Sequence, residues 1–192
     1  KDGLKPCYDL SVTPITCEWS PHGYGYRLPT EAEWEKAARG GLVNNTNDPS
    51  KTGRYPWGDT IDHSQANYLD HSVSGGYHPS YMTGAEPYTS PVGSFAANGY
   101  SLHDMAGNLW EFCWDRYAQD YYEERKDPRG SDSGNLRVVR GGSWRNDADH
   151  ARCAKRRSDA GGGRYHLNGF RLAQSAYEAI YKNIKISYQT DY

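Results

Sequence analysis

Residues 27–41 read Arg27-Leu28-Pro29-Thr30-Glu31-Ala32-Glu33-Trp34-Glu35-Lys36-Ala37-Ala38-Arg39-Gly40-Gly41, and they carry the clearest local signal in the chain. Thr30 can cap a helix N-terminus, and Glu33 can bond back to the Thr30 amide in a capping box. Trp34 and the two alanines that follow fall on one helix face, and Gly40 suits the left-handed residue that ends a helix. The stretch therefore predicts a short helix that starts at Thr30, buries one tryptophan and ends at Gly40.

The composition favours one domain built around a few large rings. The chain has 192 residues, of which 36% are hydrophobic and 14% aromatic, with 21 glycines and 10 prolines. A chain of this length suits a single domain. The glycines and prolines indicate many turns instead of long helices. We expect one domain over residues 1–192, with a C-terminal tail of unknown role at 174–192.

Charge and hydropathy argue against two classes of partner. The net charge is -2, and no basic stripe exists outside Arg152–Arg157, so nucleic-acid binding is not expected. No apolar run approaches the roughly 20 residues that cross a bilayer, and no leader-like segment opens the chain. We expect no transmembrane segment in these residues.

The four cysteines do not settle the redox compartment. Cys7, Cys17, Cys113 and Cys153 lack the C-x-x-C spacing that is typical of zinc sites. A Cys7–Cys17 disulfide and inert buried thiols are both open interpretations.

The middle of the chain reads as a long loop followed by strands. Residues 42–92 have no periodicity, so something must pin them. Strands are predicted in residues 104–114, after a turn, in Leu136–Arg140 and in Phe170–Ala173, where apolar and polar residues alternate. The loop carries aromatic rings that can act as anchors, and a cation is a further candidate; the rings are Tyr55, Trp57, Tyr68, Tyr77, Tyr81 and Tyr88.

Eight short motifs occur in order between residues 20 and 173. They are Tyr26-Arg27-Leu28-Pro29-Thr30-Glu31-Ala32-Glu33-Trp34-Glu35, Pro56-Trp57-Gly58, Ala66-Asn67, Pro91-Val92-Gly93, Asn98-Gly99-Tyr100, Gly107-Asn108-Leu109-Trp110-Glu111, Arg140-Gly141-Gly142-Ser143-Trp144 and Gly169-Phe170-Arg171-Leu172. Together they resemble the formylglycine-generating-enzyme family.

The resemblance implies an α+β fold, namely that family's variant of the C-type lectin fold. This fold has short antiparallel strands, two helices and extensive ordered loops. The family's first strand and helix have no match here, and the tail has no family counterpart. Within the tail, Tyr177, Tyr181, Ile184 and Tyr188 recur at helical spacing, which is more typical of packing than of function.

The positions that carry the family's chemistry lack the required side chains. The resemblance implies two redox cysteines after Gly-Gly-Ser, but the matching residues here are Asn146 and Ala151, and neither can form a thiolate. We expect Ser143 to be a turn residue. The related iron-dependent branch would need an H-x-x-x-H-x-E arrangement, which the histidines at 63, 71, 78, 103, 150 and 166 do not form. The sequence therefore predicts no enzyme and no catalytic cofactor.

A structural calcium ion is compatible with the resemblance. Asp104, Gly107, Leu109 and Glu111 fall on the family's calcium positions, where carboxylate and carbonyl oxygens suit a hard cation. The alternative is that Glu111 only caps a turn. A second family site at Asn67 and Tyr68 lacks an evident acidic partner, and the lectin-like pieces Glu86-Pro87 and Trp144-Arg145-Asn146-Asp147 are short enough to be chance.

Residues 145–168, here called the display segment, are polar and glycine-rich. A disordered loop is one interpretation. Against it, Ala148, Arg152, Ala154, Arg156 and Arg164 recur at the spacing by which the family frames its last loop. Apart from Lys155, every residue of the segment can be reached from an Asn codon by changing adenines. This pattern resembles the variable region of diversity-generating-retroelement proteins, most closely the variable proteins of Treponema.

That second resemblance implies a non-catalytic, surface-displayed protein whose ligand-binding face is diversified. We expect Tyr165, Arg145, Arg157 and His166 to be the main anchors, since Tyr and Arg dominate interface hot spots, and a protein ligand would bury about 800 Å² on this side. Arg152, Arg156 and Arg164 are scaffold by comparison. The predicted binding residues are Arg145, Asn146, Asp147, Asp149, His150, Arg157, Ser158, Asp159, Ala160, Gly162, Gly163, Tyr165, His166, Leu167 and Asn168.

Location and partner follow only from the resemblance. It implies a cell-surface protein, an outer-membrane lipoprotein with an anchor upstream of these residues, which binds an unknown protein or surface ligand as a monomer. Two alternatives stay open: a formylglycine-generating-enzyme-like oxidoreductase with unrecognised chemistry, or a non-diversified adhesin or carbohydrate-binding domain.

Overall fold

The computed structural model describes residues 6–12, 16–17, 25–41, 53–119, 128–161 and 165–174. These residues belong to two compact units, one drawn from residues 1–28 and 172–192 and the other comprising residues 29–171. The single-domain organisation of residues 1–192 stays a prediction, and the tail beyond residue 174 lies outside the described residues.

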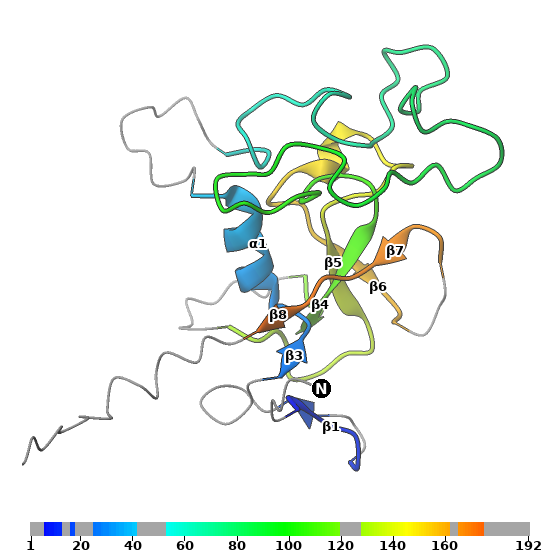
Figure 1. Ribbon diagram of the computed structural model, residues 1–192. Helices are drawn as coiled ribbons and strands as arrows, with labels where there is room; N and C mark the ends of the chain where they lie inside the picture. Colours follow the sequence, from blue (N-terminus) through cyan, green and yellow to red (C-terminus); the bar gives the residue numbers. More distant parts are fainter. Residues whose placement is uncertain are drawn as a thin grey trace, which may run out of the picture. The chain divides into compact units, whose positions relative to one another are not determined.

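The larger unit is built on a four-stranded sheet (Figure 1). Its strands are β4 (Trp110–Arg116), β5 (Arg137–Arg140), β6 (Arg157–Asp159) and β7 (Asn168–Gly169), in the order β6-β5-β4-β7. β4 and β6 pair antiparallel with β5, and the register between β4 and β5 shifts between Phe112 and Arg116. β7 pairs parallel with β4, a departure from the antiparallel strands that we expected. The segment between β5 and β7 thus begins and ends on the same sheet.

The predicted helix is confirmed as α1 (Glu31–Arg39). The Thr30 hydroxyl accepts the Glu33 N–H at 3.1 Å, and the Glu33 carboxylate accepts the Thr30 N–H at 2.9 Å. Gly40 follows with φ 55°, and a Cβ there would lie 2.9 Å from the Gly99 nitrogen, so both conformation and space require glycine. The other helix among the described residues is the 3₁₀ helix η2 (Ala148–Ala151), so only one of the two helices there is an α-helix.

α1 packs on the sheet through a small apolar core. Its buried residues are Trp34, Ala38, Met105, Cys113, Val138 and Cys153. Beside this core lies the fully buried guanidinium of Arg140, which stacks on the Trp34 ring with a Cζ-to-centroid distance of 5.3 Å and forms ion pairs with Glu31 and Glu35. Its terminal nitrogens also donate to the Lys155 carbonyl at 2.6 Å and the Cys153 carbonyl at 2.9 Å, whereas its Nε has no hydrogen-bond partner. Arg140 therefore ties α1 to the backbone of the display segment.

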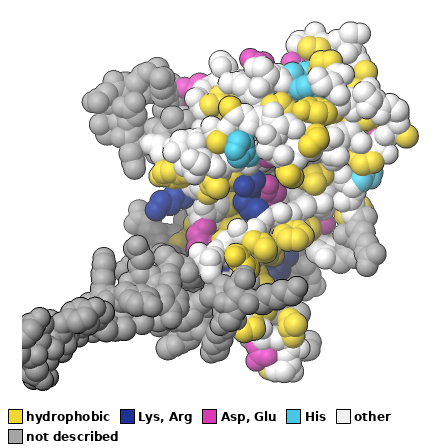
Figure 2. Space-filling model, in the orientation of Figure 1, with side chains coloured by type: hydrophobic (Ala, Val, Ile, Leu, Met, Phe, Trp, Pro, Cys, Tyr) yellow, Lys and Arg dark blue, Asp and Glu magenta, His cyan; other side chains and the backbone are white. Residues whose placement is uncertain are grey.

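The long loop before β4 is pinned by aromatic rings, as the sequence predicted. Tyr55 and Tyr68 are buried, and Tyr77 and Tyr88 pack on Trp144 with centroid distances of 5.5 and 5.2 Å. Figure 1 shows this loop, in cyan and green, gathered at one end of the sheet, and Figure 2 shows its surface apolar side chains scattered among polar ones. The rings thus take the place of regular secondary structure.

Histidines add pins that the sequence did not reveal. His78 is buried and packs against His63, with ring centroids 4.9 Å apart. Its Nε2 lies 2.7 Å from the His63 carbonyl oxygen, and its Nδ1 accepts the Ser80 N–H at 3.2 Å. One ring nitrogen must donate and the other must accept, so the neutral form of His78 is the one that fits.

The smaller unit contains strands too short for sequence periodicity to reveal. β1 (Tyr8–Asp9) pairs with β2 (Thr16–Cys17), and β3 (Tyr26–Arg27) pairs with β8 (Ala173–Gln174), both antiparallel. Cys7 is a buried free thiol that donates to the Gly25 carbonyl at 2.9 Å, whereas the side chain of Cys17, the other half of the possible disulfide, lies outside the described residues. Cys113 and Cys153 are also buried free thiols. Among the described residues, no helix is long and apolar enough to cross a membrane.

The predicted strand at Phe170–Ala173 was largely wrong. Only Ala173 lies in a strand, whereas Phe170 is 67% exposed and outside any strand. The side chains do alternate between inside and outside, but the apolar ones are on the outside. Arg171 points inward and binds Glu111, whereas its apolar neighbours Phe170 and Leu172 are exposed.

Candidate ligand-binding site

The display segment is held in place mainly by backbone hydrogen bonds. The Leu69 N–H donates to the Asn146 carbonyl at 2.9 Å, and the Cys153 N–H donates to the Arg54 carbonyl at 2.8 Å. At the far end, the Trp110 N–H donates to the Leu167 carbonyl at 2.8 Å. These bonds do not depend on which side chain a residue carries, so they hold the segment whatever its filling.

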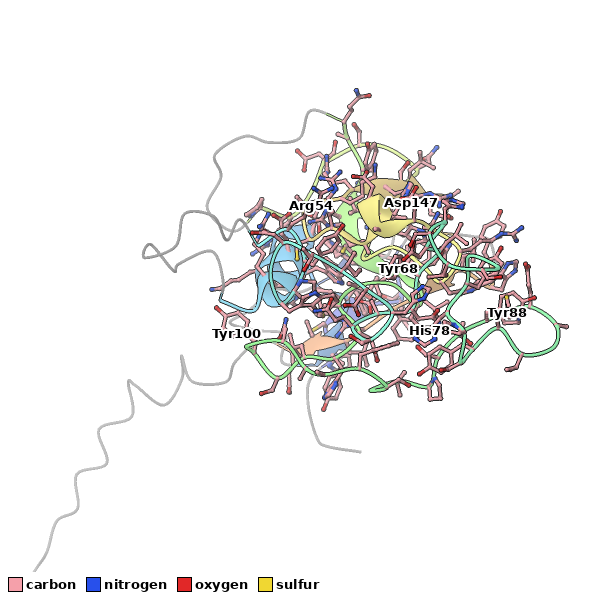
Figure 3. All side chains as sticks on the ribbon, turned by 90° about the horizontal axis from the view of Figure 1, so that it is seen from above. Arg54, Tyr68, His78, Tyr88, Tyr100 and Asp147 are labelled. Carbon is pink, nitrogen blue, oxygen red and sulfur yellow. The ribbon has the colours of Figure 1, made fainter. Side chains whose placement is uncertain are left out.

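A glycine turn fixes the start of the segment. Gly142 has φ 78°, and a Cβ there would come within 3.0 Å of the His150 backbone. The chain then passes into η2, where the Asp147 side chain accepts the Asp149 N–H at 3.1 Å. Figure 3 shows Asp147 beside this short helix.

None of the predicted binding residues that the structure describes is buried. Tyr165 is 57% exposed, which is incompatible with a core role. The other exposed ones are Arg145, Asp149, Arg157, Ala160 and His166, and the half-buried ones are Asn146, Asp147, His150, Ser158, Asp159, Leu167 and Asn168. Gly162, Gly163 and the predicted scaffold residue Arg164 lie outside the described residues.

Two fully buried indoles lie beneath these side chains. The Arg157 guanidinium lies over the Trp110 ring at 5.5 Å from its centroid, and the His150 ring meets the same indole edge-on at 5.9 Å. The Arg145 guanidinium and the His166 ring lie 6.0 and 5.9 Å from the Trp144 ring. Rigid, nonpolar supports of this kind can hold surface side chains without fixing their identity.

Some of the predicted binding residues also belong to the frame. The Asn146 Oδ1 accepts the Trp110 indole N–H at 2.8 Å and the Ser143 hydroxyl at 2.6 Å. Asp147 accepts from the His150 ring at 2.8 Å, a hydrogen bond that lowers the pKa of Asp147. Asn168 donates to the Asp159 carboxylate at 3.1 Å. Of these residues, Asn146 is the most constrained, since its oxygen serves a buried indole.

The predicted frame residues are only partly correct. Ala154 is exposed, so its assignment to the frame was wrong; the adjacent Cys153 is the buried residue. Arg156 does act as scaffold, because it pairs with Glu31 at 2.6 Å and stacks on Tyr117. Sequence spacing located the loop but mistook which of two adjacent residues points inward.

The sequence did not reveal that part of the long loop lies beside the display segment. Glu86 in the long loop pairs with Arg145 at 3.2 Å, and Tyr77 and Tyr88 pack on the Trp144 indole that also supports His166. The two lectin-like pieces of sequence thus lie side by side, with the Glu86 carboxylate engaged by a guanidinium. No local pattern links residues 59 positions apart, so only the abundance of aromatic residues in the loop hinted at this contact.

The positions that would carry oxidase chemistry hold no thiol. Asn146 serves Trp110, and Ala151 is 1% exposed in the aromatic cluster under the loop. The nearby Cys153 is fully buried, and burial raises the pKa of its thiol to about 12. Burial also raises the pKa of the Cys113 thiol well above its usual value. Neither thiol forms a reactive thiolate at neutral pH.

The four predicted calcium residues line one cavity of about 510 Å³. Asp104 fits a cation: its Oδ2 accepts the Gly93 N–H at 2.6 Å, while its Oδ1 is buried without a hydrogen-bond partner. Glu111 is more than a turn cap, because its oxygens accept from Arg171 at 2.5 and 2.6 Å and from the Trp34 indole at 2.7 Å. A hard cation could therefore use Asp104 and backbone carbonyls, sharing Glu111 with Arg171. At the second family position, the Asn67 amide is engaged by the Tyr88 carbonyl at 2.8 Å.

Comparison with known proteins supports the resemblance seen in the sequence. The model of the sulfatase-modifying factor enzyme 1-like domain matches residues 9–176. A serine/threonine-protein kinase pkn1 of Chlamydia caviae is 41% identical over 154 residues, which are 78% of this chain and 21% of the relative. A formylglycine-generating enzyme of Thermomonospora curvata is 42% identical over 127 residues, 62% of this chain and 39% of the relative.

Among solved structures, Treponema denticola variable protein 1 superposes with a TM-score of 0.64 at 34% identity, over 83% of this chain and 50% of that protein. The chain spans about a fifth to a half of the length of these three proteins. Enzymes and a variable protein are thus both among its relatives. The chain belongs to the family of the sulfatase-modifying factor enzyme 1-like domain, and its fold is the C-type lectin-like fold of that family.

Proposed function

We propose that this chain is a non-catalytic ligand-binding protein whose display segment presents exchangeable side chains to a partner. The observation that carries the proposal is the separation between a fixed backbone, called the frame, and exchangeable surface side chains, called the filling. The backbone of the segment is bonded to Leu69, Arg54, Trp110 and Arg140, while every described predicted binding residue is exposed or half-buried. Exchange of the exposed side chains costs little stability, because surface substitutions mostly stay within about 0.5 kcal/mol; Asn146, whose oxygen accepts the Trp110 indole N–H, is the exception.

Diversification by a retroelement is part of this proposal. Its support is the adenine-accessible composition of residues 145–168, together with the structural likeness to Treponema denticola variable protein 1. The coding DNA offers a direct test. A second, nearly identical copy of the last segment, with AAC or AAT at the variable positions and a reverse transcriptase beside it, is expected; its absence would favour a non-diversified adhesin.

A display library tests the exchange of side chains in the protein itself. Arg145, Asp149, Arg157 and Tyr165 would be randomised together, and folded clones counted by thermal protection from protease. We expect most clones to fold and some to bind a chosen protein after selection. In a matched library, Trp110, Trp144, Arg140 and Ala151 would be randomised and should yield few folded clones. Equal loss of folding in both libraries would overturn the proposal.

Absence of oxidase chemistry also belongs to the proposal, since Asn146 and Ala151 replace the thiol pair and both are engaged in packing or hydrogen bonding. Copper-dependent oxygen consumption by the purified chain would instead support an oxidoreductase. We further propose a cell-surface location through an upstream lipid anchor, a monomeric state and a protein ligand, because a diversified face serves an external partner.

A structural calcium ion is the last element of the proposal. The buried, unpartnered Asp104 Oδ1 is the observation that favours it. Calcium bound there would join the loop at 92–93 to the start of β4 and stiffen the edge of the sheet, without touching the display segment.

A further inference from the structure

Among the cations of the display segment that the structure describes, Arg157 lacks an ion-pair partner. Between residues 145 and 161, Arg145 pairs with Glu86, Arg156 with Glu31, and both Arg152 and Lys155 with Asp149, at distances between 2.6 and 3.5 Å. The Arg157 side chain is exposed and has no carboxylate partner or hydrogen bond among the described residues. Its five N–H donors are therefore available to a ligand.

The unpaired guanidinium is held on a rigid support. It lies over the Trp110 ring, which is fully buried and fixed by its indole N–H to Asn146. The backbone of Arg157 is fixed as well, since β6 pairs with β5 in the register Arg157 to Val139. A guanidinium that is already oriented loses less entropy when it binds, and its planar fork matches the two oxygens of a carboxylate.

Neighbouring charges limit what the site can accept. The Asp147 carboxylate is engaged by His150, and Asp149 by Arg152 and Lys155. Asp159, two residues along β6, accepts from Asn168 and stands opposite Arg137 in the sheet. Arg157 is thus the one described cation of the segment without a carboxylate partner, and carboxylates lie along the same segment, an arrangement that suits a single negative charge better than a phosphate dianion.

We propose that Arg157 is the specificity residue of this chain and binds a carboxylate of an acidic side chain on the partner protein. This inference rests on the proposed function, because it assigns chemistry to the same face. Tyr165, exposed and on the same segment, is available to add aromatic contact area. Other chains of this kind would differ at position 157 and would select other groups.

N-acetylglutamate is the probe for the experiment, and N-acetylglutamine is its uncharged match. Binding is followed by the NMR shifts of the arginine Nε–H and tryptophan indole N–H groups of the intact chain. We expect saturable shifts at Arg157 and Trp110, and an affinity for the amide at least about 10-fold lower. Arg157→Gln should reduce the response to that of the amide, whereas Arg152→Gln, at a cation already paired with Asp149, should leave it unchanged.

Three results would overturn the inference: equal shifts with both probes, an unchanged response in Arg157→Gln, or tighter binding of inorganic phosphate than of N-acetylglutamate. These outcomes are distinct from failure of the proposed function. If the randomised libraries fold and yield binders while the two probes bind equally, only the proposed recognition of a carboxylate by Arg157 is refuted. If the libraries do not fold, the proposal that the side chains of the display segment can be exchanged is refuted, even where the carboxylate probe binds.

Discussion

Replacing Arg140 by methionine tests the physical difference between frame and filling. The guanidinium is fully buried between Glu31 and Glu35 on α1 and the carbonyls of Cys153 and Lys155 in the display segment. Methionine keeps much of the volume over the Trp34 ring but removes the charge and the donors. Two glutamates then lose a cation, and two carbonyls lose their charged hydrogen bonds.

The expected cost is about 3 kcal/mol of unfolding free energy. Removing one partner of a buried ion pair costs roughly 3–5 kcal/mol. The lower end applies here, because Glu31 keeps Arg156 at 2.6 Å and Glu35 keeps Arg39 at 2.7 Å. By contrast, Arg157→Ala removes an exposed cation–π contact and should cost at most about 1 kcal/mol. The two arginines lie on adjacent strands, so their difference isolates burial and pairing.

Urea unfolding followed by tryptophan fluorescence and by circular dichroism measures both variants. A loss of less than about 1 kcal/mol for Arg140→Met would refute the role of Arg140 as a tie. An equal loss for Arg157→Ala would refute the separation of frame from filling. If Arg140→Met is too unstable to purify, Arg140→Lys, which retains the charge, should recover part of the stability.

Three further predictions concern binding, pH and metal. Tyr165→Ala should weaken binding of a selected partner by at least about 1 kcal/mol while leaving the melting temperature nearly unchanged, measured by calorimetry on one preparation; a large fall in melting temperature would make Tyr165 a core residue. Burial lowers the pKa of His78 below its usual 6.5, so the unfolded chain takes up the proton first; its contribution to stability is complete above pH 6.5 and declines as the pH falls toward the folded pKa. Urea midpoints between pH 8 and 5 should show this decline, and His78→Gln should flatten it; an identical slope in the variant would exclude His78 as the source. Added calcium should raise the melting temperature of the wild type, and Asp104→Asn should reduce that rise; the same rise in both would place any calcium elsewhere.

Local signals predicted α1 well because its determinants lie within the helix. Thr30, Glu33 and Gly40 form caps with residues at most three positions away, and the structure shows each of these bonds. The short strands escaped prediction because β1, β2 and β3 span two residues each, which is only one period of alternation and too short to show a repeat. At Phe170–Ala173 the alternation was visible, but the partly buried ion pair of Arg171 with Glu111 reversed which residues point inward.

The display segment could be located from the sequence, but the residues that contact it could not. Composition and framing residues indicate where surface side chains lie, and most of the chosen residues are exposed or half-buried. The dual role of Asn146 depends on an indole 36 positions away, and the pairing of Arg145 with Glu86 spans 59 positions. Contacts at such separations follow from the path of the chain in space, which periodicity does not encode.

The parallel pairing of β7 with β4 has a consequence for length. The Trp144 N–H donates to the Asn108 carbonyl, and the Trp110 N–H donates to the Leu167 carbonyl, so both ends of the segment are bonded to residues 108–110, where β4 begins. Its ends are closed by the sheet, and the chain between Asp159 and Asn168 can lengthen without moving them. Doubling that connection would cost only about 0.6 kcal/mol of closure entropy. Insertions and deletions should therefore be tolerated there, which would let the face differ in reach as well as in chemistry.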